Sequence, residues 1–550
     1  MKKRYPNKSN VLLINITRLG DMLQATPTIA GIKEENPGAS LTVLVEKQFS
    51  SICNHLPYID EIIPLDLGST VRSLAKEAEG IVEAYDYVTD VVEDLRSRGF
   101  DYCVNMSNSA YTALLIRLLR IQRIGGWAAD DEGYRVIESD WARLFASCVF
   151  HTNRLYNSLN LVDIFRCSAD VEKHPKKLLM NVSDKAMQFA RDFIAAQNFT
   201  NSGPIIAIQA GASQRKRQWD PRNFSKLINI LTKKLNARVI LTGSNSEGAI
   251  IRRILDMCDT KNAASAAGKT DLEQLAALLK LSDILITGDT GPMHISVAVG
   301  TPVVAMFLAS ALGFETGPYS EGNLVLQPVI DCHPCNPNKA CSRPDCHALI
   351  VPSELAKLVE LRLQGEVNTL PHNMFDSKRV VVYKTVFDEH GFLDMHPLNG
   401  EFGGKETARF RKAYRYMWLD DIGGIKVGKP TNGNFKLQIH NDALEGIGQI
   451  IDLADKGTQT IETLIETIKD TSSPPSRLKE CSALLEQIDH GIEQLGYHVP
   501  EAGLLTRMFI FAKENISGSE PLSLASQMSE VYSDLSRRGK KLMDYYHSIN

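Results

Sequence analysis

The segment Thr287–His294 combines a glycine-rich turn with a carboxylate and an imidazole, reading Thr-Gly-Asp-Thr-Gly-Pro-Met-His. The apolar run before it predicts a buried strand, and the residues after it predict a helix. A turn that opens a helix directs backbone N–H groups and the positive end of the helix dipole toward an anion. Four residues of this segment are therefore candidates to bind phosphate oxygens or sugar hydroxyls: Asp289, Thr290, Gly291 and His294.

A second acidic loop, Arg18-Leu-Gly-Asp21, follows the first apolar run of the chain. Gly20 allows the backbone to turn tightly beside Asp21. A carboxylate that faces a cleft can accept a proton from a hydroxyl, which makes Asp21 a candidate general base. A Gly-Asp pair after a strand also fits an ordinary helix N-cap or turn, so the loop alone leaves both interpretations open.

A basic loop, Ala210–Trp219, follows another predicted strand. Its small residues can present main-chain N–H groups to a diphosphate, and these residues are Gly211, Ala212 and Ser213. A cation further along the loop, Lys216 or Arg217, can neutralise a leaving group, and the sequence leaves the choice between them open. The alternative interpretation is a solvated basic loop.

These three loops, together with Gly243-Ser-Asn-Ser-Glu247, resemble the motifs of glycosyltransferase family 9, the bacterial ADP-heptose transferases that act on lipopolysaccharide. The order of the motifs is also that of the family, and the resemblance covers roughly residues 10–362. It implies that Asp21 is the general base, that Glu247 contacts the nucleoside and that Arg18 lies on the acceptor side. The chain departs from the family in having Arg217, with Lys216 just before it, where the family has a lysine two residues before tryptophan.

The elements that must hold these loops alternate between apolar strands and amphipathic helices, once from Val11 and again from Pro204. This alternation predicts an α/β protein with two Rossmann-like domains facing a cleft, and the resemblance implies the GT-B arrangement. We expect an acceptor domain over residues 1–180 and a nucleotide-sugar domain over 181–365. Helical spacing of apolar residues then predicts a separate, mainly helical extension over 376–550.

Four of the ten cysteines, namely Cys332, Cys335, Cys341 and Cys346, fall within one short loop of the second domain. Such clustering is typical of a closed tetrathiolate metal site, and we expect a structural iron or zinc ion there. Disulfides and free thiols are the alternatives. The family transfers its sugar without a metal, so no metal is expected in the chemistry itself.

Composition excludes several classes of protein. Sixty-one basic against 65 acidic residues give a net charge of −4, which argues against a strongly cationic nucleic-acid binder and against a disordered acidic chain. The apolar run at Val11–Ile16 is too short for a signal peptide, and Ile295–Phe314 is interrupted by Gly-Thr-Pro. We therefore expect no transmembrane segment and a cytoplasmic protein, with peripheral contact at the inner membrane as an option.

The resemblance implies an inverting glycosyltransferase that moves heptose from ADP-heptose to a hydroxyl of an anionic acceptor. That acceptor would be a lipopolysaccharide core, another cell-surface glycan or a protein, and no nucleic-acid partner is expected. The helical extension could mediate homo-oligomer formation. Two alternatives stay open: the same fold acting on a different nucleotide sugar, and a non-catalytic scaffold built on a degenerate transferase fold.

Overall fold

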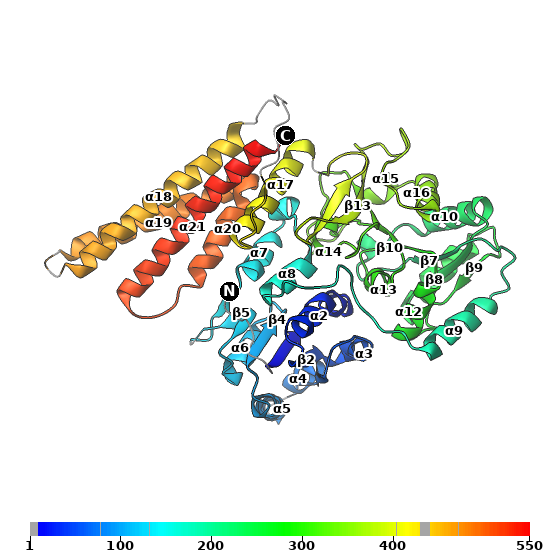
Figure 1. Cartoon of the computed structure of the whole chain (residues 1–550), viewed down its shortest axis with the longest axis horizontal. Helices are drawn as coiled ribbons and strands as arrows, with labels where there is room; N and C mark the ends of the chain where they lie inside the picture. The colour runs from blue at the N-terminus through cyan, green and yellow to red at the C-terminus, as the bar shows by residue number, and fades with distance from the viewer. Residues whose placement is uncertain are drawn as a thin grey trace. The chain divides into compact units, whose positions relative to one another are not determined.

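The computed structural model describes residues 9–76, 79–130, 132–402, 404–428, 441–470, 472 and 474–549 (Figure 1). The chain forms two compact units. The first comprises Met1–Ser107, Leu118–Gly125 and Leu159–Phe402, and the second comprises Asn108–Arg117, Gly126–Ser158 and Gly403–Asn550. The basic residues 1–8, which the sequence analysis placed in the acceptor domain, lie outside the described residues, as do residues 429–440 of the predicted helical extension.

The first sheet has the strand order β3-β2-β1-β4-β5-β6. Its strands are β1 (Asn10–Asn15), β2 (Ser40–Glu46), β3 (Glu61–Leu65), β4 (Tyr102–Asn105), β5 (Ile124–Ala129) and β6 (Arg135–Ile137). Strands β1 to β4 pair in parallel, whereas β6 runs antiparallel to β5. The residues of β1 after Asn10 are all buried, as expected for a central parallel strand covered on both faces.

Short helices follow the parallel strands of this half. They are α1 (Leu19–Gln24), α2 (Thr26–Glu35), η1 (Lys47–Phe49), α3 (Ser50–Cys53), α4 (Leu67–Leu74), α5 (Glu79–Ser97) and α8 (Leu161–Ser168). The loop between β1 and α1 carries the Arg18–Asp21 motif, so the first crossover places that motif at the carboxyl end of a central strand.

The second sheet has eight strands in the order β14-β13-β12-β11-β10-β7-β8-β9. They are β7 (Ile205–Gln209), β8 (Arg238–Thr242), β9 (Ala263–Ser265), β10 (Ile284–Gly288), β11 (Val303–Met306), β12 (Leu324–Pro328), β13 (Val380–Phe387) and β14 (Leu393–Pro397). Strands β7 to β12 are parallel, and β13 and β14 add to the edge of the sheet in antiparallel pairing. This sheet therefore continues past residue 376, where the sequence analysis began the helical extension.

Helices cover both faces of this second sheet. They are α9 (Asp184–Ala195), η3 (Arg215–Arg217), α10 (Pro221–Lys234), η4 (Asn245–Glu247), α11 (Gly248–Asp256), α12 (Leu272–Lys280), α13 (Gly291–Val299), α14 (Gly313–Thr316), α15 (Cys346–Leu349) and α16 (Pro352–Gln364). Successive residues of β7 enter different cores: Ile206 and Ile208 pack with α10, α11 and α16, whereas Ile205 packs with α9 and α12.

Helix α10 illustrates why these elements form where they do. The Asp220 side chain caps it by accepting from the Arg222 backbone N–H at 2.8 Å, and Pro221 occupies the first turn. Four apolar residues at helical spacing, Phe224, Leu227, Ile228 and Leu231, are buried against the sheet. Burial of each such side chain stabilises the domain by about 1.5–3 kcal/mol.

The second unit is mainly helical. It holds α6 (Ala110–Leu119) except for its last two residues, and also α7 (Asp140–Cys148), η2 (Asn153–Tyr156), α17 (Gly404–Asp421), α18 (Asn441–Lys469), α19 (Pro475–His498), η5 (Pro500–Ala502), α20 (Gly503–Glu514) and α21 (Pro521–Ser548). Figure 1 shows α18 to α21 lying alongside one another. The backbones of α18 and α21 approach closely at Gly457, where a Cβ atom would lie 2.4 Å from the Tyr532 ring.

Part of the predicted acceptor domain belongs to this helical unit. The Asn515 side chain accepts from the backbone N–H of Ile137 at 3.0 Å and donates to its carbonyl at 2.6 Å, in the manner of a paired strand. Asn153 donates to the carbonyl of Gly503 at 3.1 Å. Residues 126–158 are therefore bonded to the two ends of α20 by contacts between residues far apart in sequence, which a local sequence pattern does not predict.

The structure confirms the predicted fold class: two largely parallel sheets with helices and a helical C-terminal region. Over the described ranges, no helix combines the length and the apolar character that crossing a membrane requires.

Candidate active site

The turn between β10 and α13 is built to receive an anion. Thr290 occupies the N-cap position of the nine-residue helix α13 in an extended conformation, and its side chain makes no capping hydrogen bond. Its hydroxyl instead lies 3.0 Å from that of Thr287. The side chain of Thr290 therefore leaves the Gly291 N–H uncapped, while Pro292 has no N–H and the Met293 N–H donates to the Thr290 carbonyl at 3.1 Å. The helix dipole adds partial positive charge at Gly291.

Arg217 is directed to this turn. Its Nη1 donates to Asp289 Oδ2 at 3.0 Å and its Nε donates to the Ser310 hydroxyl at 2.9 Å. Asp289 also accepts from the Thr316 hydroxyl at 3.3 Å. A guanidinium group is thus fixed beside the open N-terminus of α13. Ser310 and Thr316 are not among the predicted residues, because the loop that holds Ser310 and the short helix α14 that ends at Thr316 carry no sequence motif.

Lys216, the other cation that the sequence left open, points elsewhere. Its Nζ donates to the backbone carbonyls of Asn336, Pro337 and Lys339 at 3.0, 3.0 and 2.7 Å. The ammonium group therefore fastens the cysteine-containing loop to the basic loop.

Glu247 and the predicted diphosphate loop lie against each other. A Cβ atom at Gly211 would be 1.4 Å from Glu247 Oε1, so this approach requires glycine. Gln209 Nε2 donates to Oε1 at 3.1 Å, and the Ser244 N–H and hydroxyl donate to Oε2 at 2.7 and 2.9 Å. Glu247 therefore completes the capping box of η4 and at the same time borders the Gly211–Ser213 loop. In that loop Ala212 is half-buried and Ser213 is exposed.

Asp21 is held at the start of α1. Its Oδ2 accepts from the Arg18 backbone N–H at 3.1 Å, and Asn15 Nδ2 donates to the Asp21 carbonyl at 3.2 Å. The local cap that the sequence allowed is therefore present. The Asp21 side chain stays half-buried, and Arg18 is exposed.

The Asp21 loop and the N-terminus of α13 meet within the first unit. A Cβ atom at Gly20 would lie 3.0 Å from His294 Cδ2. Burial lowers the pKa of His294 to about 4, and the Asp21 charge opposes this shift. The imidazole is therefore neutral at pH 7, and its Nδ1 is buried without a hydrogen-bond partner among the described residues.

The cysteine loop holds the four residues of the predicted metal site. The thiols are neighbours: burial, with a further contribution from Cys332, raises the pKa of Cys335 to about 11. All four are free, and Cys332 and Cys341 are exposed whereas Cys346 is buried. Within the part of the chain that the structure describes, no group of three or more potential ligands is arranged to hold a metal ion. A structural iron or zinc ion at these cysteines therefore stays a prediction.

Comparison with known proteins agrees with this geometry. Residues 88–344 match the model of glycosyltransferase family 9 (heptosyltransferase). The chain is a glycosyltransferase and over these residues is similar to family 9. The match ends before the helices of the C-terminal region, α17 to α21.

Two relatives illustrate the similarity. Lipopolysaccharide heptosyltransferase 3 of Escherichia coli K12 is 24% identical over 303 residues, which is 53% of this chain and 80% of that protein. The lipopolysaccharide core heptosyltransferase OpsX of Haemophilus influenzae is 24% identical over 342 residues, which is 61% of this chain and 88% of that protein. A family 9 glycosyltransferase structure from Veillonella parvula shares the fold, with a TM-score of 0.52 at 18% identity over 65% of this chain and 98% of that one.

Proposed function

We propose that this glycosyltransferase moves heptose from ADP-heptose to a hydroxyl of an anionic acceptor with inversion at the anomeric carbon. The acceptor would be a lipopolysaccharide core, another cell-surface glycan or a protein. The observation that carries the proposal is the meeting of the Asp21 loop with His294 at the start of α13, which joins a carboxylate to an anion-binding helix end. The names of the relatives support heptose as the sugar.

The donor diphosphate binds at the N-terminus of α13 and along the Gly211–Ser213 loop in this scheme. The Gly291 N–H at the start of α13 and the main-chain N–H groups of Gly211–Ser213 would bind its oxygens, beside the Arg217 guanidinium that Asp289 holds. Negative charge grows on the diphosphate as its bond to the sugar breaks, and fixed donors stabilise that charge more in the transition state than in the bound donor. The chain's own cation and helix dipole can thus assist departure of the leaving group.

Asp21 acts on the acceptor. Its carboxylate takes the proton of the attacking hydroxyl, and the oxygen forms a bond to the anomeric carbon on the face opposite the diphosphate. The bond between that carbon and the phosphate oxygen breaks in the same step, and ADP leaves. The neutral imidazole of His294 can orient a sugar hydroxyl, and Arg18, exposed beside Asp21, supplies positive charge toward an anionic acceptor.

Replacement of the base tests the proposal. Asp21→Asn keeps an acceptor for the N-cap hydrogen bond but removes the basic carboxylate, so we expect transfer to fall at least about a hundredfold with ADP affinity preserved. Asp66→Asn is the control, because Asp66 also accepts a backbone hydrogen bond at the start of a helix, α4, and lies outside the site. Undiminished transfer by the Asp21→Asn protein would show that Asp21 is not the general base. Absence of both ADP binding and donor turnover in the unmodified protein would favour a scaffold, and turnover of a different nucleotide sugar would redefine the donor.

A further inference from the structure

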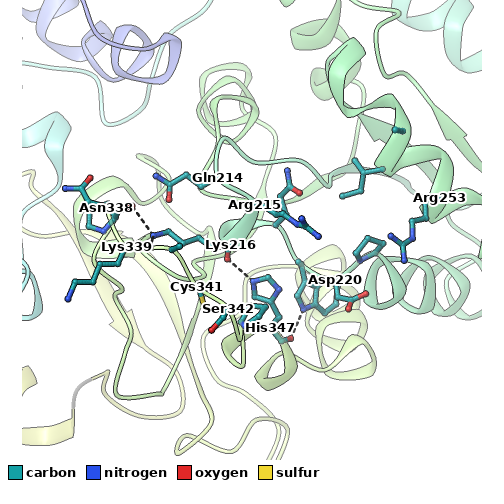
Figure 2. A pocket seen from close by; sticks show the side chains of 18 residues that line it. Gln214, Arg215, Lys216, Asp220, Arg253, Asn338, Lys339, Cys341, Ser342 and His347 are labelled. Atoms are coloured by element: carbon teal, nitrogen blue, oxygen red, sulfur yellow. Dashed lines mark hydrogen bonds between the residues drawn. The ribbon is translucent and has the colours of Figure 1, made fainter.

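A pocket of about 960 Å³ lies beside the basic loop (Figure 2). We name it the basic groove. Its walls come from the basic loop, the start of α10, helix α11 and the cysteine loop. The lining residues are Gln214, Arg215, Lys216, Gln218, Trp219, Asp220, Pro221, Ala249, Ile250, Arg253, Pro337, Asn338, Lys339, Ala340, Cys341, Ser342, Pro344 and His347. This volume falls in the range of pockets that bind small molecules.

The groove is distinct from the proposed donor site. The turn η3 separates the two, because its last residue, Arg217, reaches Asp289 whereas Arg215 and Lys216 line the groove. Neither Asp289 nor His294 contributes to the lining. A ligand of the groove would therefore touch the opposite side of the turn that holds Arg217.

The walls of the groove are fixed to each other before any ligand arrives. His347 Nε2 donates to the Lys216 carbonyl at 2.9 Å, and Trp219 Nε1 donates to the His347 carbonyl at 2.9 Å. Lys216 Nζ adds its bonds to the three carbonyls of the cysteine loop, which Figure 2 shows beside Asn338. A preformed pocket of this kind loses little conformational entropy on binding.

The lining carries positive charge that the described residues do not neutralise. The side chains of Arg215, Arg253 and Lys339 are exposed and make no hydrogen bond or ion pair with any described residue. Asp220, the acidic residue of the lining, is occupied by Arg222 at 2.8 Å, and this hydrogen bond lowers its pKa. Figure 2 shows Arg253 and Lys339 toward opposite ends of the groove, so a cation is available to a phosphate at either end.

Apolar atoms supply the remaining surface. Pro221, Ile250 and Pro337 also line the groove. Guanidinium groups match phosphate oxygens in geometry, and proline and isoleucine faces suit a ring. We propose that the basic groove binds a phosphorylated small molecule, with its phosphate on the cations and its ring on the apolar wall. This inference does not depend on the proposed heptosyl transfer.

Calorimetric titration of the full chain with inorganic pyrophosphate tests the groove. We expect two pyrophosphates per chain, one at the donor loops and one in the groove. Arg253→Glu should remove the second or weaken it at least about tenfold, as expected for loss of a charge-assisted hydrogen bond. Arg252→Glu is the matched control, since Arg252 is an exposed neighbour on the same helix outside the lining. If the donor proposal fails, the Arg252→Glu protein still binds one pyrophosphate, and that binding is still lost on Arg253→Glu.

Thiol labelling provides an independent readout. Cys341 lines the groove and Cys332 does not, although both are exposed. Pyrophosphate should slow alkylation of Cys341 relative to Cys332, and Arg253→Glu should abolish this protection. Repeating the titration with ADP and with a sugar monophosphate identifies which phosphate source binds more tightly. The proposal would be overturned if the Arg252→Glu and Arg253→Glu proteins bound pyrophosphate equally. It would also be overturned if the native protein bound a single pyrophosphate and the Arg253→Glu protein still bound it.

Discussion

Gly211 offers the sharpest test of how the donor loops are assembled. A methyl group placed there would lie 1.4 Å from Glu247 Oε1 and 2.3 Å from its Cδ, so Gly211→Ala must displace the Glu247 carboxylate. Displacement breaks the hydrogen bonds to Gln209 and to Ser244. Loss of the cap costs about 1 kcal/mol, and loss of the Gln209 hydrogen bond costs about the same. We therefore expect about 2 kcal/mol of destabilisation.

A double-mutant cycle separates this contact from a general effect of alanine in the loop. Glu247→Ala removes the obstructing side chain, so Gly211→Ala should cost much less in the Glu247→Ala background than in the native one. The assay is urea unfolding followed by circular dichroism, with the ADP dissociation constant measured in parallel. If Gly211→Ala destabilises both backgrounds equally, Glu247 is not what excludes the methyl group, and the assembly of the two loops described above is incorrect.

Three further predictions concern charge. Because the native pKa of His294 is depressed to about 4, the unfolded state binds more protons between that value and about 6.5. Stability should therefore fall as pH drops through this window, by roughly 3 kcal/mol in total, and pH-dependent unfolding of His294→Gln should lack that component. Arg217→Met should lower donor turnover by about a hundredfold, while Lys216→Met, which releases the cysteine loop, should change it less than about tenfold in steady-state kinetics. Asp421 lies buried between Arg537 and Arg538, which lower its pKa to about 2 against the effect of burial. Asp421→Asn should thus destabilise the helical unit by about 3 kcal/mol in thermal unfolding without altering donor turnover, and loss of turnover would contradict this separation.

The sequence predicted those features that depend on neighbours along the chain. The loop before α13, the cap at Asp21 and the Gly243–Glu247 loop each arise where a strand ends and a helix begins, and such geometry repeats whenever the local pattern repeats. Apolar spacing likewise predicted the long helices α18 to α21. The sequence did not predict the direction in which a long side chain points.

Tertiary structure decided the remaining points, because each depends on atoms that are distant in sequence. Arg217 rather than Lys216 reaches Asp289, since the carbonyls that attract the lysine come from residues 336–339. Strand β13 joins the second sheet because its buried face and backbone groups find β12 as a partner. The four clustered cysteines range from exposed to buried, and their spacing along the chain does not indicate this difference. Short motifs thus specify the local chemistry of the site, whereas the packing of remote segments determines which of two neighbouring cations reaches it.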